Sequence, residues 1–245
     1  MLSGLPLLAE EVVEKGYHYE INKQEHVATL MRYSGSSSNV TIPNSIKCNG
    51  VEYHVTAIND RAFSEGKVKK RIKKIRIGDY IKSIGENSFE GCTALVSIDF
   101  GSSVSTIGYS AFYGCTSLSS ISIPPSVTSI GNYAFADCTV LNSIEIGENV
   151  KTIGNKAFKY CLSITTLVLP KSVTTIGDEA FAGCEKLKMI TCHAEKVPKT
   201  DISAFNYVKL QHIILNVPES SIEEFKKHAP WMDFGTTTSI LRRSY

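Results

Sequence analysis

Five cysteines recur at one fixed spacing, and this row of thiols has the clearest potential for chemistry in the sequence. Each lies 23 residues after the last, while Cys48 and Cys192 stand outside the row of Cys92, Cys115, Cys138, Cys161 and Cys184. Thiols in a row could bind a metal ion or form disulfides. Seven cysteines cannot all pair within one chain, however, and no C-x-x-C pair supports a zinc-ribbon or thioredoxin-like site.

The alternative is that cysteine, which packs as a small hydrophobe, fills one buried position in each repeat. The thiols would then all point the same way into a core, even if neighbouring Cα atoms came close enough for a disulfide. No histidine recurs with them as a metal partner. We therefore favour buried cysteines and expect no metal ion and no cofactor. Cys192 falls at an apolar strand position, so we expect it in the core too.

The sequence contains no catalytic signature that we can identify. Its six histidines lack H-x-x-x-H and H-E-x-x-H spacing, and we interpret them as scattered surface or cap residues: His18, His26, His54, His193, His212 and His228. Nucleophile-elbow, P-loop and dinucleotide-binding motifs are absent as well. We therefore expect no enzymatic activity. A hydrolase would need a nucleophile and a base that meet in a pocket.

The charge of the chain is uneven, because residues 66–76 hold seven basic residues and no acidic one. The basic segment consists of Lys67, Lys69, Lys70, Arg71, Lys73, Lys74 and Arg76. Subtracting these seven from the net charge of +2 leaves −5 on the rest of the chain. The segment could bind a polyanion (an acidic glycan, lipid headgroups or nucleic acid), or it could be a solvated edge that prevents pairing with other molecules. No aromatic residues interleave it for base stacking, so nucleic acid is the least favoured ligand.

The cysteines belong to a repeat of 23 residues, V-x-x-I-G-x-x-A-F-x-x-C-x-x-L-x-x-I-x-I-P, which occurs in five full copies. Its phenylalanines are Phe89, Phe112, Phe135, Phe158 and Phe181, and weaker copies add Phe63 before them and Phe205 after them. A fixed period of this length is typical of a solenoid, because one unit cannot bury its own apolar face but stacked units can. We expect about seven rungs, with residues 17–54 and 206–235 as caps, residues 55–205 as the solenoid, and tails at 1–16 and 236–245.

Each part of the unit has a local structural reason. L-x-x-I-x-I alternates like a half-buried strand, prolines such as Pro124 and Pro170 end it, and V-x-x-I is a second short strand. We expect the glycine after that isoleucine to supply a turn with positive φ, and A-F-x-x-C to form a tight helical or 3₁₀ turn. In the caps, residues 17–33 and Asn49-Gly50 predict hairpins. Ile213–Val217 predicts the last strand, and a capping box at Ser220 predicts a helix of about ten residues.

Residues that bind a partner must lie between the core positions that recur every 23 residues. The outward strand positions include Lys74, Arg76, Asp99, Ser122 and Glu145, and they form a small, polar strip. The tyrosines lie in the I-G-x-x-A-F-x-x-C turns instead, at Tyr109, Tyr113, Tyr133 and Tyr160. We consider both surfaces and the basic segment as binding candidates, beside the alternative that all are ordinary surface residues.

The unit, as in "SVTSIGNYAFADCTVLNSIEI", resembles the BspA-like leucine-rich-repeat family of bacterial surface and secreted proteins, which has treponemal-type repeats. The resemblance runs from about Val40 to Phe205 and extends into both flanks. It implies an α/β-type, right-handed leucine-rich-repeat-like solenoid and a non-catalytic adhesion module that binds host protein, other bacteria or glycans. We expect a monomer without a transmembrane segment. The opening "MLSGLPLLAE" is interpreted as either a signal-peptide remnant or a tail.

Overall fold

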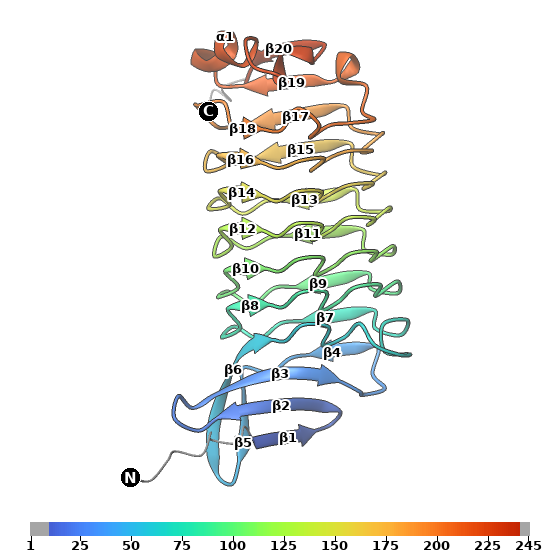
Figure 1. Ribbon diagram of the computed structural model, residues 1–245, viewed down its shortest axis with the longest axis vertical. Coiled ribbons are helices and arrows are strands. Elements are labelled where there is room, and N and C mark those ends of the chain that lie inside the picture. Colours follow the sequence, from blue (N-terminus) through green and yellow to red (C-terminus); the bar gives the residue numbers. More distant parts are fainter. Residues whose placement is uncertain (1–9, 241–245) are drawn as a thin grey trace, which may run out of the picture.

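The computed structural model describes residues 10–240, and these wind into an elongated stack of about nine turns (Figure 1). The stack exceeds the seven rungs expected from the repeats, because both caps contribute strands that lack the repeat motif. The expected signal-peptide remnant lies largely outside the described residues. No helix within residues 10–240 is long and apolar enough to cross a membrane.

One side of the stack is a continuous eleven-stranded sheet, built in its repeat region from the V-x-x-I segments. Its strands pair in the order β1 (Glu10–Glu14), β2 (Tyr17–Asn22), β3 (Val27–Tyr33), β6 (Val51–Ile58), β8 (Ser83–Ile84), β10 (Thr106–Ile107), β12 (Ser129–Ile130), β14 (Thr152–Ile153), β16 (Thr175–Ile176) and β18 (Lys199–Thr200), with β5 (Ser45–Cys48) against β6. Pairing from β6 onward is parallel, and Ile107 lies opposite Ile130 one repeat later. The sequence period is therefore the register of the sheet.

The other side carries the L-x-x-I-x-I strands in three shorter parallel sheets. They are β4 (Asn39–Thr41), β7 (Lys74–Arg76) and β9 (Ser97–Asp99); β11 (Ser120–Ser122) and β13 (Ser143–Glu145); and β15 (Thr166–Leu169), β17 (Met189–Cys192), β19 (Ile214–Val217) and β20 (Thr236–Ser239). The alternation predicted from the sequence is confirmed, because Ile75 and Ile77 are buried between exposed Lys74 and Arg76.

Antiparallel strands at the N-terminal end close one end of the core. The hairpin predicted around residues 17–33 is confirmed by the pairing of β2 with β3. The second hairpin joins β5 to β6 through Asn49 and Gly50, whose φ angles of 50° and 80° are those of a tight hairpin turn. β1 pairs with β2 and so places a strand inside the segment that we expected to be a tail.

The C-terminal cap differs from the sequence prediction in two ways. The helix α1 has only four residues, Ile222–Phe225, no side-chain hydrogen bond caps it, and a 3₁₀ turn η2 (Glu219–Ser221) precedes it. β19 is not the last strand, because β20 pairs with it in parallel within the expected tail. The remaining 3₁₀ turns are η1 (Leu210–His212) and η3 (Trp231–Asp233).

A column of phenylalanine rings runs through the core from rung to rung. Consecutive rings from Phe63 to Phe205 stack nearly parallel, with centroids 4.7–5.6 Å apart. Tyr33 covers the first ring, and Trp231 and Phe234 meet the last ring edge-on, as expected for residues that close the core. Each ring therefore loses its contact with water only when the neighbouring rungs are in register.

The row of cysteines is a structural feature of the turns. All five thiols are fully buried and unpaired, and each donates a hydrogen bond to the phenylalanine carbonyl of the preceding rung; for example, Cys138 Sγ lies 3.3 Å from Phe112 O. The equivalent S–O distances in the other rungs are 3.2–3.7 Å. A thiol thus fits the apolar slot and also satisfies a carbonyl that has left water. Cys192 is fully buried, as predicted.

The glycine after each V-x-x-I strand has a different role from the one we predicted. Positive φ occurs two residues later, at Asn87, Ser110, Tyr133, Lys156 and Glu179, and not at these glycines. The glycines are needed for close approach: a Cβ on Gly131 would lie 2.6 Å from Ile107 O of the previous rung. At these glycines the rungs therefore lie closer together than any side chain would allow.

The A-F-x-x-C segments form hydrogen-bonded turns and not helices.

Thiol accessibility tests the buried cysteine row. In the native protein at about pH 8, a thiol reagent such as Ellman's should modify only Cys48, which is half-buried, because the other six thiols have no contact with solvent. In concentrated guanidinium chloride all seven should react. A Cys48→Ala variant should show no native reaction. Native reaction of Cys115 or Cys138 as fast as that of Cys48 would contradict the buried row.

Alkaline pH provides a second test. Burial raises the pKa of the Cys138 thiol to about 12, whereas an exposed thiol ionises near ~8.5. Between these values only the unfolded chain releases the proton, so stability falls as pH rises. The contribution of Cys138 to the free energy of unfolding should be constant below about pH 8.5 and then decline by about 1.4 kcal/mol per pH unit.

The matched comparison is the wild type against Cys138→Ala, unfolded with urea at about pH 8 and at about pH 10. The stability gap between the two proteins should shrink by roughly 2 kcal/mol over this interval, because alanine has no proton to lose. A gap that stays constant with pH would show that the thiol ionises alike in both states.

Candidate binding surfaces

The outward strand positions form a strip whose polar groups already pair with each other between rungs. Ser122 Oγ donates to Glu145 Oε2 over 2.7 Å, and Arg76 Nε lies 3.6 Å from Asp99 Oδ2. Most of the other outward positions are exposed or half-exposed serine and threonine, and the exceptions are Lys74, Val168 and Met189. Small polar side chains gain little binding free energy when a partner covers them. Apart from Arg76, the strip therefore lacks the tryptophan, tyrosine and arginine side chains that usually dominate the energy of an interface.

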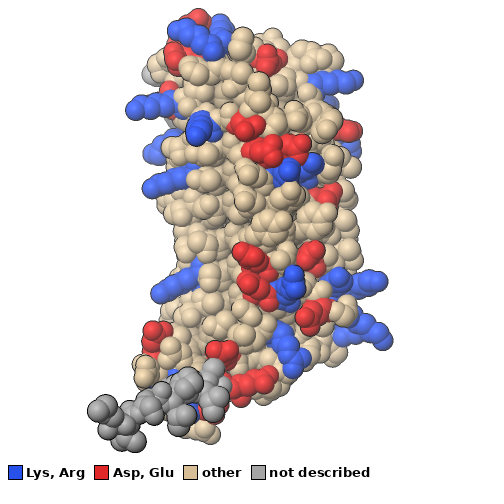
Figure 2. Space-filling view, in the orientation of Figure 1, with Lys and Arg blue, Asp and Glu red and all other residues tan. Residues whose placement is uncertain are grey.

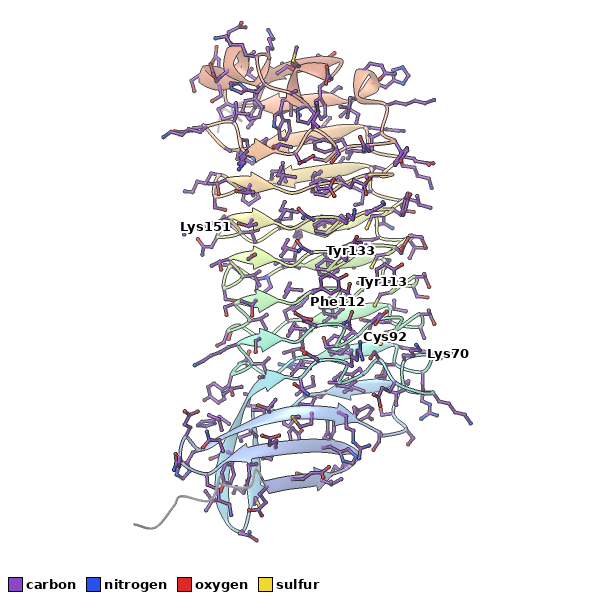
Figure 3. The ribbon with its side chains drawn as sticks, viewed as in Figure 1. Lys70, Cys92, Phe112, Tyr113, Tyr133 and Lys151 are labelled. Carbon is purple, nitrogen blue, oxygen red and sulfur yellow. The ribbon has the colours of Figure 1, made fainter. Side chains whose placement is uncertain are left out.

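The basic segment lies in the loop before β7 and in β7 itself. Six of its seven basic side chains are exposed, and Ile72, Ile75 and Ile77 bury the opposite face and fix the segment to the core. Lys69 differs, because its aliphatic stem folds back over Gly91 of the next rung and is half-buried. In Figure 3, Lys70 projects sideways from the stack. Only Arg76 has an acidic partner in the described part of the chain.

The four tyrosines of the turns come together on the middle rungs, and we call them the tyrosine patch: Tyr109, Tyr113, Tyr133 and Tyr160. Tyr109 is 44% exposed and its ring centroid lies 5.5 Å from that of Tyr133. Tyr160 is 38% exposed. Figure 3 shows Tyr113 and Tyr133 near the middle of the face toward the viewer, and Figure 2 shows few charged side chains in the same zone.

Two of these tyrosines have an unfavourable backbone conformation. Tyr133 and Tyr160 have φ values of 57° and 58°, in the left-handed region that bulky residues rarely adopt. At the position of Tyr160 the neighbouring rungs carry Asp137 and Gly183, which also have positive φ. The left-handed conformation is therefore imposed by the repeat, and Tyr160 adopts it at a position where glycine or a short polar residue would fit with less strain.

Lysine side chains, one from the next rung and one from the same rung, lie over two of the tyrosine rings. Lys156 Nζ lies 5.4 Å from the centroid of Tyr133, and Lys159 Nζ lies 5.0 Å from that of Tyr160. Lys159 is fixed in turn by Glu179, 2.5 Å away. A hydrogen bond to Asp137 raises the pKa of the Tyr113 phenol. The patch is therefore partly pre-organised, which lowers the entropy cost of binding.

A shallow groove of about 520 Å³ on the strand side was not foreseen from the sequence. Ile144, Val168 and Pro170 form its apolar floor, and Glu145, Lys171 and His193 lie at its rim. It opens where β13 and β15 belong to separate sheets. Val168 lies 23 residues after Glu145, at the same outward strand position, and is exposed although it is apolar.

Comparison with known proteins agrees with this architecture. The family model of the BspA type leucine rich repeat region matches six copies over residues 56–188 and 151–229. The chain belongs to the BspA-type leucine-rich-repeat family. No curated protein matches it.

Solved structures share the fold of this BspA-type chain. The T. pallidum leucine-rich repeat protein is 28% identical, with 78% of this chain and 86% of that chain covered and a TM-score of 0.69. A leucine-rich repeat protein from Bacteroides ovatus is 19% identical (94% and 76% covered, TM-score 0.50). A leucine rich cell surface protein from Faecalibacterium prausnitzii is 16% identical (96% and 96% covered, TM-score 0.48).

Substitution of Tyr160 tests the backbone strain in the tyrosine patch. Tyr160→Gly removes the ring and relieves the left-handed strain, whereas Tyr160→Ala removes the ring and keeps the strain. We expect the glycine variant to be the more stable of the two by about 1 kcal/mol in urea unfolding. Equal stabilities, or a more stable alanine variant, would show that φ at this position costs nothing.

Proposed function

We propose that this protein is a secreted or cell-surface binding module, whose repeat surface holds a protein or glycan partner without changing it chemically. The observation that carries the proposal is the tyrosine patch, in which Tyr109 and Tyr160 are 44% and 38% exposed and Tyr109 contacts Tyr133 across a rung boundary. Tyrosine gives a large, rigid contact area at a low entropy cost and is enriched at interface hot spots.

The contrast between the two sides of the solenoid supports this assignment. The strand strip offers small polar groups that already pair with each other, whereas the tyrosine patch offers half-exposed rings. The repeated residues form the core, so specificity for a partner must come from unrepeated positions such as Tyr109 and Tyr133. These two lie in contact across a rung boundary.

Family membership supports an extracytoplasmic, bacterial location, with host proteins, other bacteria or glycans as partners. Because the row of thiols is buried, it stays reduced without depending on the redox state of the surroundings. A monomer suffices for such a module, since each end of the core is covered by its own cap.

A binding array tests the function and its location on the molecule together. The purified chain is applied to immobilised matrix proteins and glycans, and the binders are measured again with Tyr109→Ser/Tyr133→Asn. We expect this variant to lose at least ~10-fold in affinity, since each hot-spot ring contributes about 2 kcal/mol or more. The matched control, Ser120→Ala/Ser122→Ala on the strand strip, should bind as the wild type does. Loss in the control alone would place the interface on the strand side.

A second function rests on the basic segment, which could bind an acidic glycan or another anionic surface. Six exposed basic side chains follow one another in the segment, and among residues 10–240 only Arg76 forms an ion pair with an acidic residue. A cluster of this kind raises the local concentration of polyanions in a salt-dependent way. Nucleic acid is disfavoured, because no ring stacks within the segment.

Heparin chromatography tests this second function. Lys70→Ser/Lys73→Ser/Lys74→Ser should elute at clearly lower salt than the wild type. Lys151→Ser/Lys171→Ser/Lys188→Ser is the matched control, because it removes the same charge from exposed positions outside the segment and should elute close to the wild type. Equal shifts in both variants would show that only net charge matters and would reject a specific site.

A further inference from the structure

Three side chains of the N-terminal cap form a chain of hydrogen bonds that ends on an exposed serine. His18 lies on β2, with its Nδ1 3.0 Å from Glu11 Oε1 on β1 and its Nε2 2.9 Å from Ser34 Oγ, just after β3. From the sequence we expected His18 to be a scattered surface or cap residue. In the structure it is only 9% exposed, and this buried ring joins an acid to a hydroxyl.

The local fold explains why these residues meet. β1, β2 and β3 are consecutive antiparallel strands, which lie side by side in Figure 1. The loop after β3 rests directly on the turn before β2, because Gly16 and Gly35 touch: a Cβ on Gly16 would lie 2.6 Å from Gly35 Cα. The Ser34 N–H also donates to Gly16 O over 2.8 Å. The serine is thereby held against the imidazole.

The neutral imidazole with its proton on Nδ1 fits the contacts to Glu11 and Ser34, whereas an imidazolium would donate to both and leave the Ser34 hydroxyl proton for Gly16 O. With the proton on Nδ1, the ring donates to the Glu11 carboxylate, and Nε2 is left as an acceptor for the Ser34 hydroxyl. The hydroxyl has a second acceptor in Gly16 O, but this oxygen is farther away, at 3.3 Å. A serine, a neutral imidazole and a carboxylate in this order are the arrangement that activates a nucleophile.

A pocket and a set of donors adjoin the serine. Ser34 lines a cavity of about 350 Å³ whose charged residues are three basic ones and one acidic one: Arg32, Lys67, Arg71 and Glu65. Arg71 Nη1 lies 3.5 Å from Gly35 O, so its guanidinium reaches the residue that follows the serine. The Gly35 N–H has no hydrogen-bond partner among the residues that the structure describes. The N–H after a nucleophile is a common oxyanion donor, and a guanidinium can assist it.

We propose that Ser34, His18 and Glu11 form a hydrolytic site for small esters whose acyl group carries a carboxylate. The cationic pocket fits such a group, and its size limits the substrate. The site lies outside the repeats and does not depend on the binding function. It meets the condition that a hydrolase must bring a nucleophile and a base together in a pocket.

The reaction proceeds in two balanced halves. Ser34 Oγ attacks the ester carbonyl carbon while its proton passes to His18 Nε2, and the oxyanion receives hydrogen bonds from Gly35 N–H and Arg71. The C–O bond to the alcohol breaks, and the alcohol leaves with the proton from His18. Water, deprotonated by His18, then attacks the acyl-serine and releases the acid and the free serine. Glu11 touches no reacting atom and is a positioning residue.

Covalent labelling of the full chain provides the primary test. A fluorophosphonate probe forms a bond to an activated serine oxygen with loss of fluoride, and peptide mass spectrometry locates it. We expect the label on Ser34 of the wild type. Ser34→Ala should lose it, and Ser36→Ala, a neighbouring exposed serine, should keep it. Absence of the label from Ser34 of the folded wild type would overturn the proposal without reliance on any variant.

Steady-state kinetics separate catalysis from a purely structural clamp. 4-Nitrophenyl succinate, which carries a carboxylate, should be hydrolysed faster than 4-nitrophenyl acetate, with Ser34→Ala giving the background from surface amines. His18→Gln should lower kcat by ~100-fold or more. Glu11→Gln should lower kcat with KM unchanged, and Arg71→Gln should both lower kcat, through the lost oxyanion contact, and raise KM for the succinate ester. Rates equal to the Ser34→Ala background in the wild type would show that the three residues serve only to hold the cap.

Discussion

The structure depends on the register between successive rungs, which is fixed where the phenylalanine rings stack. Each ring covers the next at about 5 Å, and the adjoining turns exchange backbone hydrogen bonds such as Phe112 N–H to Ala134 O. A slip of one residue would break the ring column, the thiol–carbonyl bonds and the parallel ladder together. This shared dependence explains why phenylalanine, cysteine and glycine recur without variation in the five full copies while the residues between them vary.

The repeat alone could predict most of the fold. A period of 23 residues, with isoleucine, phenylalanine and cysteine in fixed places, leaves few ways to bury all of them other than a stack. Predictions failed where a residue has two physical uses. Glycine after the V-x-x-I strand was expected for its positive φ, but it is required for close backbone approach, and only the packing of Gly131 on Ile107 distinguishes the two. The capping box at Ser220 did not form, and the hydroxyl of Ser221, the residue at the N-cap, donates over 2.7 Å to Glu195 O outside the helix.

The tyrosine patch and the cluster of Glu11, His18 and Ser34 were harder to predict from the sequence, because they consist of positions that the repeat does not constrain. The tyrosines were visible as residues of the turns, but their contact across a rung boundary and their left-handed backbone depend on the fold. The cluster of Glu11, His18 and Ser34 had no signal, since its members are spread over three strands without a motif. Sequence spacing can identify a group of functional residues only when they lie close together along the chain, and not when the fold brings distant segments together.

Repeated residues build the core of this protein, and unrepeated residues on its surface bind the partner. Hydrogen–deuterium exchange of the full chain, with and without a partner selected from the binding array, tests this division most directly. We expect the bound partner to slow amide hydrogen exchange in the turns around Tyr109–Tyr113 and Tyr133–Asp137 and to leave the exchange rates of β11 and β13 unchanged. Slower exchange confined to the strand strip, with no effect at the tyrosine patch, would contradict it.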